Sequence, residues 1–517
     1  YKADDRQAYA DVMANINKRF GDLSLSANIG GSFTQTYYDE RGFQGGLKDM
    51  SNVFSLYNMT TTLDKDTYPI ESGYKQRTNS IFASVEIGWK SMLYMTLTGR
   101  NDWDSALINT EQSSFFYPSI GLSGVISEMV KLPKAITYLK VRGSFASVGA
   151  PIPKNLSSNK TYEWDPATSQ WKLQTYRPLP KLYPERTNSW EAGLNAKFFN
   201  NSLSLEVTWY KANTRKQTFQ VPLSGTAVYA TMYAQSGNIE NKGMEFSLGY
   251  NKSWGDFSWN SNLTFSFNKN KIVELLDDAV DDEGNHYSLN EIDKGGIGSA
   301  KVILRKGGSM GDMYVTNRLK RDNEGNVYID KASQNVKKED IKNSDEFIHI
   351  GSVLPKSNLG FRNDFSYKGI SLGFMLAARF GGIVISPTQA VMDQFGVSKV
   401  TALARDNEGV PVNNGKVDPQ TYYTEVGGIS GLMSNYVYSA TNVRLQELSV
   451  GYSLPAKWFN NKCNLSLSIT GHNLWMIYNK APFDPEATAS TGTYYQGVDY
   501  FMQPSLRSWG FNVKIQF

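Results

Sequence analysis

The last nine residues, Trp509-Gly-Phe-Asn-Val-Lys-Ile-Gln-Phe517, alternate strictly between two kinds of side chain. Every odd-numbered position is apolar, and every even-numbered position is glycine or polar. Because successive side chains of a strand point to opposite faces, this segment predicts a strand with one face suited to lipid and one suited to water.

The same period recurs throughout the chain. In residues 81–89, 203–209, 257–267 and 465–469, apolar side chains occupy almost every second position. Segments of this kind are typical of membrane-barrel strands, but a soluble β-sandwich alternates as well. The period alone therefore leaves both folds open.

One predicted strand, residues 442–452, has a less regular pattern. The phase that places Leu448, Val450 and Tyr452 on the lipid face also places Arg444 there. We expect Arg444 to lie near the water boundary, because a charge at the centre of the hydrocarbon layer is costly.

The connections between the predicted strands are of two kinds. Tight links are Gly21-Asp22, Trp254-Gly-Asp256, Lys368-Gly369 and Asn460-Asn-Lys462. Long irregular segments are predicted at about 150–186, 271–355, 381–440 and 477–505. Short periplasmic turns opposite long extracellular loops are typical of an outer-membrane barrel and not of a sandwich. We therefore predict an all-β chain, a transmembrane antiparallel β-barrel.

The composition excludes several other classes of protein. Hydrophobic residues make up 40% of the chain, and no run of about 18 apolar residues could span a membrane as a helix. The net charge of +4, with Lys and Arg dispersed, argues against nucleic acid as a partner. Cys463 is the only cysteine and the three histidines lie far apart, so we expect no metal, cofactor or catalytic site.

The number of predicted strands is about fifteen. Bacterial barrels close with an even number of strands, and a free edge in lipid would leave backbone groups unpaired. We therefore expect other strands to complete the wall. The N-terminal residues also show no signal peptide, so the start of an exported protein is expected upstream of Tyr1.

Several short motifs follow one another in an order that is specific although each motif is weak. They are Gly99–Trp103, Phe116–Leu122, Leu139–Gly149, Glu185–Gly193, Asn238–Glu245, Val443–Leu445, Gly451–Pro455, Gly471–Trp475, Asp484–Glu486 and Pro504–Phe517. In these motifs the chain resembles the SusC/RagA family of TonB-dependent transporters. It departs from the family at residues 321–328, where many members carry an Asp/Asn/Gly-rich passage.

The resemblance implies a barrel of about 22 strands filled by an N-terminal plug, with residues 1–517 forming the C-terminal portion and the plug absent from this chain. Family members lie in the outer membrane of Gram-negative bacteria, in contact with its lipid. They import oligosaccharides or oligopeptides, with a SusD-like surface lipoprotein as lid and energy supplied through TonB. The function expected is therefore active import of a nutrient oligomer. An oligosaccharide is the preferred substrate, and an oligopeptide is the other candidate.

Two other functions stay open at this point. A passive porin would need no plug and would keep an open polar lumen. An outer-membrane barrel enzyme would need paired acids with His or Ser at one rim, and three scattered histidines disfavour it.

Aromatic side chains in the long loops are the candidate contacts for a substrate or a lid protein, since no membrane boundary requires them there. These candidates are Trp164, Trp171, Tyr494, Tyr495, Tyr500 and Phe501. Ordinary packing within the loops is the alternative. By contrast, Trp89, Trp190, Trp209, Trp254, Trp259, Trp458 and Trp509 are predicted near strand ends, as anchors at the membrane boundary.

Two acidic segments and one glycine-rich segment are candidates for an ion or phosphate site. The run Asp277–Glu283 offers carboxylates for calcium, but a solvated loop is favoured. Residues 322–326 are expected to form a hairpin turn, and Gly307–Gly311 lacks the ending of a phosphate loop and is expected to be a turn.

Overall fold

The fold is described from a computed structural model of the chain. The residues that the structure describes are 2–60, 67–108, 110, 112–152, 156, 162–165, 170–173, 176–177, 183–222, 231–280, 286–333, 335–413, 415–460, 462–490, 492 and 496–517.

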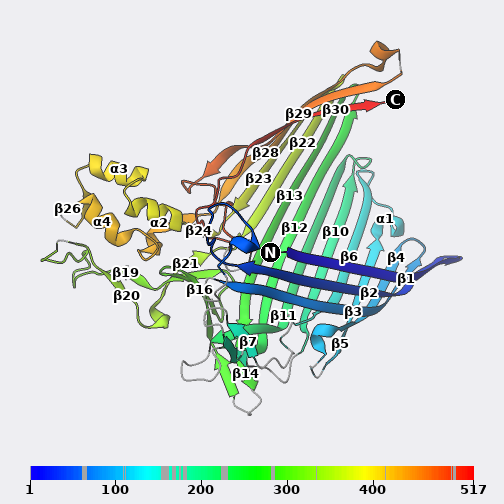
Figure 1. Ribbon diagram of the computed structural model, residues 1–517. Coiled ribbons are helices and arrows are strands. Elements are labelled where there is room, and N and C mark those ends of the chain that lie inside the picture. The colour runs from blue at the N-terminus through cyan, green and yellow to red at the C-terminus, as the bar shows by residue number, and fades with distance from the viewer. Residues whose placement is uncertain are drawn as a thin grey trace.

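Among these residues, fifteen strands form one antiparallel sheet in which each strand pairs with the next one along the path (Figure 1). The strands are β1 Lys2–Phe20, β2 Leu23–Gln44, β3 Tyr68–Trp89, β4 Leu93–Asp104, β5 Ser114–Val125, β6 Ile136–Ala150, β10 Glu185–Phe198, β11 Leu203–Pro222, β12 Thr231–Trp254, β13 Phe257–Glu274, β22 Ser357–Tyr367, β23 Ile370–Phe380, β28 Asn442–Ser453, β29 Asn464–Asn479 and β30 Ser508–Gln516. A two-residue strand, β9 Tyr176–Arg177, adds to β12 in parallel. The prediction of an antiparallel wall of about fifteen strands is confirmed.

The sheet is open. In the described part of the chain, β1 pairs only with β2 and β30 only with β29, and Figure 1 shows the two edges apart. Both edges therefore present unpaired backbone groups, which a hydrocarbon environment would not tolerate.

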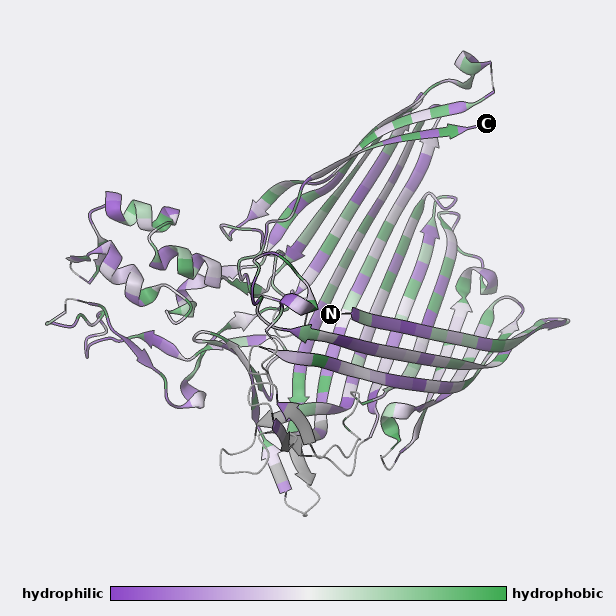
Figure 2. Cartoon of the chain, in the orientation of Figure 1, coloured by the Kyte–Doolittle hydropathy of each residue, from purple (hydrophilic) through white to green (hydrophobic). Residues whose placement is uncertain are grey.

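The alternating pattern gives the sheet two different faces (Figure 2). On β11, Val207 stands opposite Leu194 of β10 and Phe246 of β12, while the adjacent Glu206 stands opposite Asn195 and Ser247. Directly opposed residues share a face, so each apolar position continues across the neighbouring strands.

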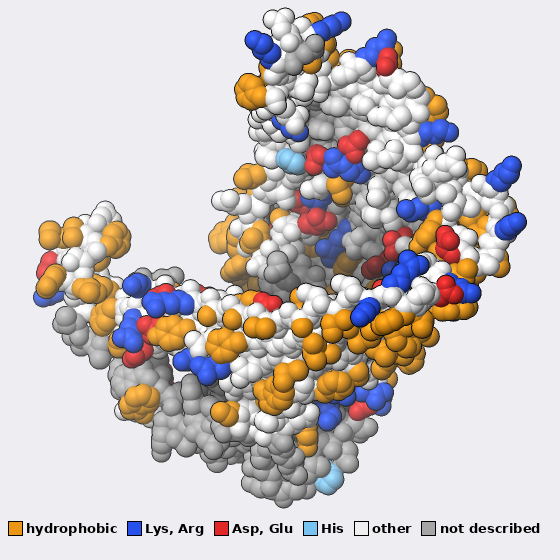
Figure 3. All heavy atoms as spheres, turned by 90° about the vertical axis from the view of Figure 1, so that its right-hand side faces the viewer, with side chains coloured by type: hydrophobic (Ala, Val, Ile, Leu, Met, Phe, Trp, Pro, Cys, Tyr) orange, Lys and Arg blue, Asp and Glu red, His pale blue; other side chains and the backbone are white. Residues whose placement is uncertain are grey.

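The predicted lipid-facing positions of the C-terminal strands follow the same rule. Leu467 pairs with Val513, and Leu465 pairs with Ile515. Figure 3 shows a hollow face on which charged side chains gather, and rows of hydrophobic side chains outside its rim. The polar face is therefore the inner one.

The tryptophans predicted at membrane boundaries lie toward the two ends of the strands. Trp89 ends β3 and Trp254 ends β12, both at short turns, and both are more than one-third exposed. Trp190, Trp209 and Trp509 lie farther from the short turns and are likewise exposed.

The strand order sorts the connections by length. Because consecutive strands of the wall are antiparallel neighbours, the connections alternate between the two ends of the sheet. At one end they are residues 21–22, 90–92, 126–135, 199–202, 255–256, 368–369 and 454–463. At the other end they are residues 45–67, 105–113, 151–184, 223–230, 275–356, 381–441 and 480–507. Every connection longer than ten residues lies at this second end.

Two of the long connections, residues 275–356 and 381–441, fold together into what we call the loop unit. Its strands are β14 Leu276–Val280, β15 His286–Leu289, β16 Glu291–Ile297, β17 Ala300–Arg305, β18 Asp312–Val315, β19 Asn317–Leu319, β20 Lys338–Asp340, β21 Ile348–Ser352, β24 Ile383–Ile385, β25 Val410–Val412, β26 Gly415–Val417 and β27 Val437–Ser439. Its helices are α2 Pro387–Gln394, α3 Lys399–Asp406 and α4 Pro419–Val426. The expectation that these segments are irregular was therefore wrong.

The loop unit is folded because it has a hydrophobic core of its own. Met313, Val353, Ile385 and Met433 are fully buried in one cluster, and Ile272 joins it from the end of β13. Burying such side chains stabilises a fold by roughly 1.5–3 kcal/mol each, so these connections hold a defined position at the end of the wall. None of the helices in the described residues has the length and apolar character needed to cross a membrane.

Candidate functional site

The inner face of the wall carries a polar cavity of about 740 Å³ between β6 and β22. Arg142 of β6 lies 3.3 Å from a carboxylate oxygen of Glu206 and donates a 2.7 Å hydrogen bond to the hydroxyl of Thr208. Glu191 and Glu245 also line the cavity. Three carboxylates face one guanidinium, so the cavity is acidic as well as hydrated.

A second charged cluster follows on the inner face of β22 and β28. Arg362 donates to Asp364 at 2.9 Å and to Glu447 at 3.4 Å, and His472 lies 3.8 Å from Glu447. These side chains are partly exposed and all come from the wall itself. They form a hydrated polar surface rather than a closed site.

The motif Gly99–Trp103 belongs to a third cluster, near the long-loop end of β4. Asp102 accepts hydrogen bonds from Arg100 at 2.7 Å and from the Tyr117 hydroxyl at 2.5 Å. Asp104 accepts from Thr78 and from the backbone N–H of Ala106, at 2.6 and 2.8 Å. Both aspartates are buried, so this motif fixes the position of the connection that follows β4.

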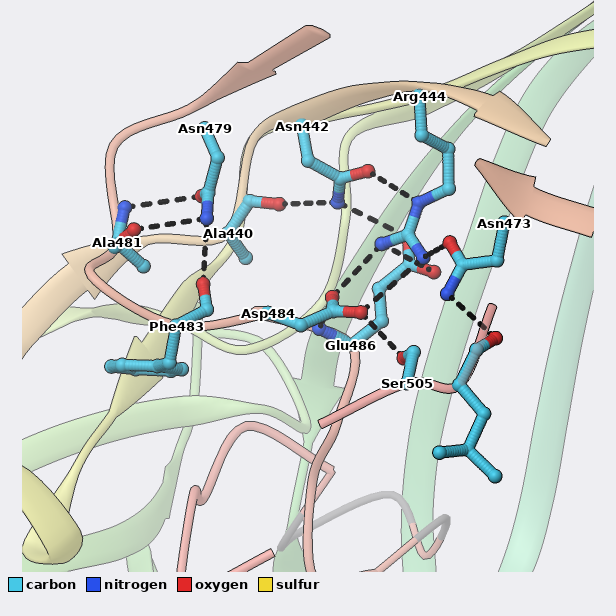
Figure 4. A network of polar contacts seen from close by, with 11 residues as sticks. Ala440, Asn442, Arg444, Asn473, Asn479, Ala481, Phe483, Asp484, Glu486 and Ser505 are labelled. Carbon is cyan, nitrogen blue, oxygen red and sulfur yellow. Dashed lines mark hydrogen bonds and ion pairs between the residues drawn. The ribbon is translucent and has the colours of Figure 1, made fainter. Parts of the chain in front are cut away.

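A network of polar contacts lies around Arg444 of β28 (Figure 4). Arg444 is only 5% exposed. Its phase predicted a position on the lipid face near the water boundary, but Arg444 does not lie there. The pairing of β28 with β23 shifts between Met375 and Leu376, which leaves Gln446 of β28 as an extra residue. This β-bulge reverses the phase, and Arg444 stands beside Ala377 on the inner face.

The partners of Arg444 come from residues 480–507, the connection between β29 and β30. Its guanidinium lies 2.9 Å from Asp484 Oδ1 and 3.2 Å from Glu486 Oε2. Asn442 donates to the second oxygen of Glu486 at 3.1 Å, and Arg444 also donates to Asn442 at 3.3 Å. We call this group the Arg444 clamp.

Asp484 has further partners within the same connection. Its carboxylate accepts hydrogen bonds from the Ser505 hydroxyl at 2.5 Å and from the backbone N–H of Glu486 at 3.0 Å. Burial alone would raise the pKa of Asp484, but these two hydrogen bonds and the charge of Arg444 hold its pKa below the ordinary value of 3.8. The carboxylate is therefore charged at neutral pH.

The same connection also binds the loop unit. Residues Gly497 and Asp499 exchange backbone hydrogen bonds with Ile385 of β24, each at 2.8 Å. The Ser386 hydroxyl donates to Asp499 at 2.5 Å, and the backbone N–H of Phe501 donates to Thr388 at 2.7 Å. Residues 480–507 thus connect the barrel wall to the loop unit.

The structure brings the predicted contact residues together in pairs. Trp164 and Trp171 stand opposite each other in a hairpin of β7 Tyr162–Asp165 and β8 Gln170–Leu173, and Trp171 is 68% exposed. Tyr500 and Phe501 are also exposed, with ring centroids 5.1 Å apart and an edge-to-face geometry. Tyr494 and Tyr495 lie outside the described residues.

The remaining motifs are turns. Asp322 accepts hydrogen bonds from the backbone N–H groups of Glu324 and Asn326, which confirms the predicted hairpin turn and lowers the pKa of Asp322. Gly307–Gly311 is a turn between β17 and β18, also as predicted. The acidic run lies partly in β14 and partly outside the described residues, and no cluster of metal-ligating side chains occurs among the described residues.

The clamp was not predicted from the sequence, although its parts were visible there. The motifs of the family resemblance include both Asp484-Pro-Glu486 and Val443-Arg-Leu445. The available signal was an arginine in the wrong phase of one strand together with an acid pair in the loop that follows the next strand.

An antiparallel wall with an apolar outer face and a hollow polar inner face defines a β-barrel membrane protein. The chain belongs to the TonB-dependent receptor family, because residues 2–299 match the family described as "TonB dependent receptor-like, beta-barrel". It is therefore part of an outer-membrane protein of a Gram-negative bacterium.

Individual relatives agree with this assignment and with the SusC/RagA resemblance. The chain is 26% identical to "TonB-dependent receptor P3" of Formosa agariphila over 541 residues, covering 97% of this chain and 51% of that protein. It is 23% identical to "TonB-dependent receptor SusC" of Bacteroides thetaiotaomicron, covering 85% of this chain and 43% of that protein. The chain thus spans about half the length of these relatives.

A solved structure shows the same fold. The chain resembles one in the "Structure of the RagAB peptide transporter" with a TM-score of 0.72 and 19% identity, covering 99% of this chain and 56% of the other.

Proposed function

We propose that the protein containing this chain actively imports a nutrient oligomer across the outer membrane, as the SusC-like barrel of a two-protein complex energised through TonB. An oligosaccharide is the proposed substrate, and an oligopeptide is the other candidate. The observation that carries the proposal is the polar inner wall, with a cavity of about 740 Å³, below a folded loop unit at one end.

Polar side chains on the inner wall suit a solute that is rich in hydroxyl or amide groups. The cavity is lined by Ser, Thr and Asn side chains together with the carboxylates of Glu191 and Glu245. Such groups exchange hydrogen bonds with a passing oligomer at little net cost, since each is also hydrated when the oligomer is absent. The pairs Trp164–Trp171 and Tyr500–Phe501, with Tyr494 and Tyr495, are proposed to stack on sugar rings or to contact a lid protein.

The wall in this chain needs further strands and a means of closure. We propose that the rest of the protein supplies the strands that join β1 to β30, a plug for the lumen and the segment that contacts TonB. A SusD-like surface lipoprotein is the proposed partner at the long-loop end, which we assign to the cell exterior. The proposal gives the chain no catalytic residue, metal or cofactor.

Uptake by cells tests this proposal directly. The full-length protein is expressed with a SusD-like lipoprotein in a host with or without functional TonB, and import of labelled oligosaccharides and oligopeptides is measured. Uptake of either class that requires TonB supports active import and identifies the substrate class. TonB-independent uptake together with a steady conductance in planar bilayers would instead establish a porin.

A further inference from the structure

The connection 480–507, which we call the strap, forms an arch between the wall and the loop unit. Its first leg binds the wall through Asp484 and Glu486, and its last leg returns at Ser505, whose hydroxyl binds Asp484. Between the two legs, Asp499 of the strap binds Ile385 and Ser386 of the loop unit. Arg444 therefore lies at the base of the arch, where both legs meet.

The clamp at this base is specific to arginine. The Arg444 guanidinium spans two carboxylates and two oxygens of Asp484, at 2.9 and 3.4 Å, in a site where the arginine side chain is 6% exposed. A planar fork can make these bonds simultaneously, whereas a lysine ammonium is a single point charge. Removal of the guanidinium would leave the Asp484 and Glu486 carboxylates facing each other without their shared cation.

The aromatic pair Tyr500–Phe501 lies on the last leg, between the two attachments of the strap. Asp499, which precedes the pair in the sequence, binds the loop unit. Ser505, which follows the pair, binds Asp484 of the clamp. The rings are 42% and 55% exposed, although they lie among the connections and not on the lipid-facing strands. Their exposure at a defined position suits contact with the planar, apolar face of a sugar or side-chain ring.

We propose that Arg444 is a positioning residue for substrate capture: by holding Asp484, and through it Ser505, it fixes both legs of the strap and so presents Tyr500 and Phe501 as an aromatic platform. This inference rests on the proposed import function. Arg444 itself does not contact the substrate. Its loss releases the base of the arch and lets the platform move, while the wall stays folded.

The test compares Arg444→Gln with Arg362→Gln in the full-length protein. Arg362 is the matched control, because it also binds two carboxylates on the inner face, but both belong to the wall. Amide hydrogen exchange is measured over residues 480–507, and uptake is measured against concentration for the oligomer that the unmodified protein imports. Outer-membrane abundance and melting temperature report any general loss of folding.

Arg444→Gln is expected to speed exchange in the strap at least about tenfold, because a buried ion pair loses one partner. Arg444→Gln should also raise the half-saturating concentration with little change in the maximal rate. Arg444→Lys should give values between those of Arg444→Gln and the unmodified protein. Arg362→Gln should leave exchange in the strap unchanged, because both of its partners belong to the wall. Tyr500→Ala combined with Phe501→Ala should raise the half-saturating concentration without faster exchange.

Two outcomes would overturn the inference: a strap that stays protected in Arg444→Gln, or a released strap with unchanged half-saturating concentration. If Arg444→Gln fails to insert, Glu486→Gln removes only one carboxylate and is judged by the same criteria. If the unmodified protein imports no oligomer, the proposed function fails, whereas the exchange measurement still decides whether Arg444 holds the strap.

Discussion

Replacement of Val207 by arginine tests the assignment of the two faces at the middle of the wall. Val207 lies five positions beyond residue 202, the end of a short connection, on the apolar face of β11. A strand rises about 3.3 Å per residue and tilts by about 40° in a barrel, which gives about 2.5 Å of depth per residue. Val207 is therefore about 12 Å deep, near the centre of an apolar band of about 25 Å.

An arginine at this depth on the lipid side should lower the free energy of unfolding by about 2–4 kcal/mol. The matched change is Ser247→Arg, since Ser247 lies on the inner face of the adjacent strand, opposite Glu206 and at similar depth. Water and nearby carboxylates surround that position, so the cost should stay within about 1 kcal/mol. Equilibrium urea unfolding of the full-length protein in lipid vesicles measures both. Equal costs, or a higher cost for Ser247→Arg, would refute the assignment of the faces.

Three further outcomes follow from the structure. Residues 1–517 expressed alone should give no compact, protease-resistant barrel on a heat-modifiability gel, because β1 and β30 leave unpaired edges; a compact species would contradict the open sheet. Deletion of Phe517, which is fully exposed beyond β30, should lower outer-membrane abundance if the residue acts as an assembly signal; normal abundance with a lower melting temperature would favour packing instead. Since the folded pKa of Asp484 is lowered, the stabilisation from its ionised form is complete above the unfolded pKa of about 3.9 and is lost as pH falls through the folded value. Strap proteolysis should therefore be constant from about pH 5 to 8 and rise only below about pH 4; a rise near neutrality would contradict this account of the clamp.

The wall could be predicted from the sequence because a strand repeats every two residues. Once Trp509 and Val513 are placed on one face, the positions between them follow, and pairing carries the same division to neighbouring strands. The register itself could not be predicted, since many slips by two residues preserve the division between the faces.

The folded loop unit was missed although its helices have recognisable start signals. Ser386-Pro387 and Asp418-Pro419 each combine a capping side chain with proline at the first helical position, and Ser398 caps α3 in the same manner. These helices have only eight residues each, too short for a clear helical period. Ala390 of α2 shares one core with the distant Val353, and Val426 of α4 shares another with Val336; no local pattern reveals such packing.

The candidate contact residues were predicted only as members of loops, and the structure adds which of them are neighbours. Trp164 and Trp171 become partners through a short hairpin, and Tyr500 and Phe501 are held by their attachment to α2. The acidic cavity needed Glu191, Glu206 and Glu245 to align across three strands, and this depends on register.

Arg444 shows how one inserted residue changes the role of a side chain. In a regular strand it would share the face of Leu448 and Val450, where a charge costs up to about 2–4 kcal/mol. The extra residue Gln446 turns it inward, where Asp484 and Glu486 supply the opposite charge. A charged residue in the lipid phase of an otherwise alternating strand therefore has two explanations, a boundary position or a bulge. An acid pair in the next connection at the same end of the sheet, as in Asp484-Pro-Glu486, favours the bulge, because the buried cation then has partners that a boundary arginine would not need.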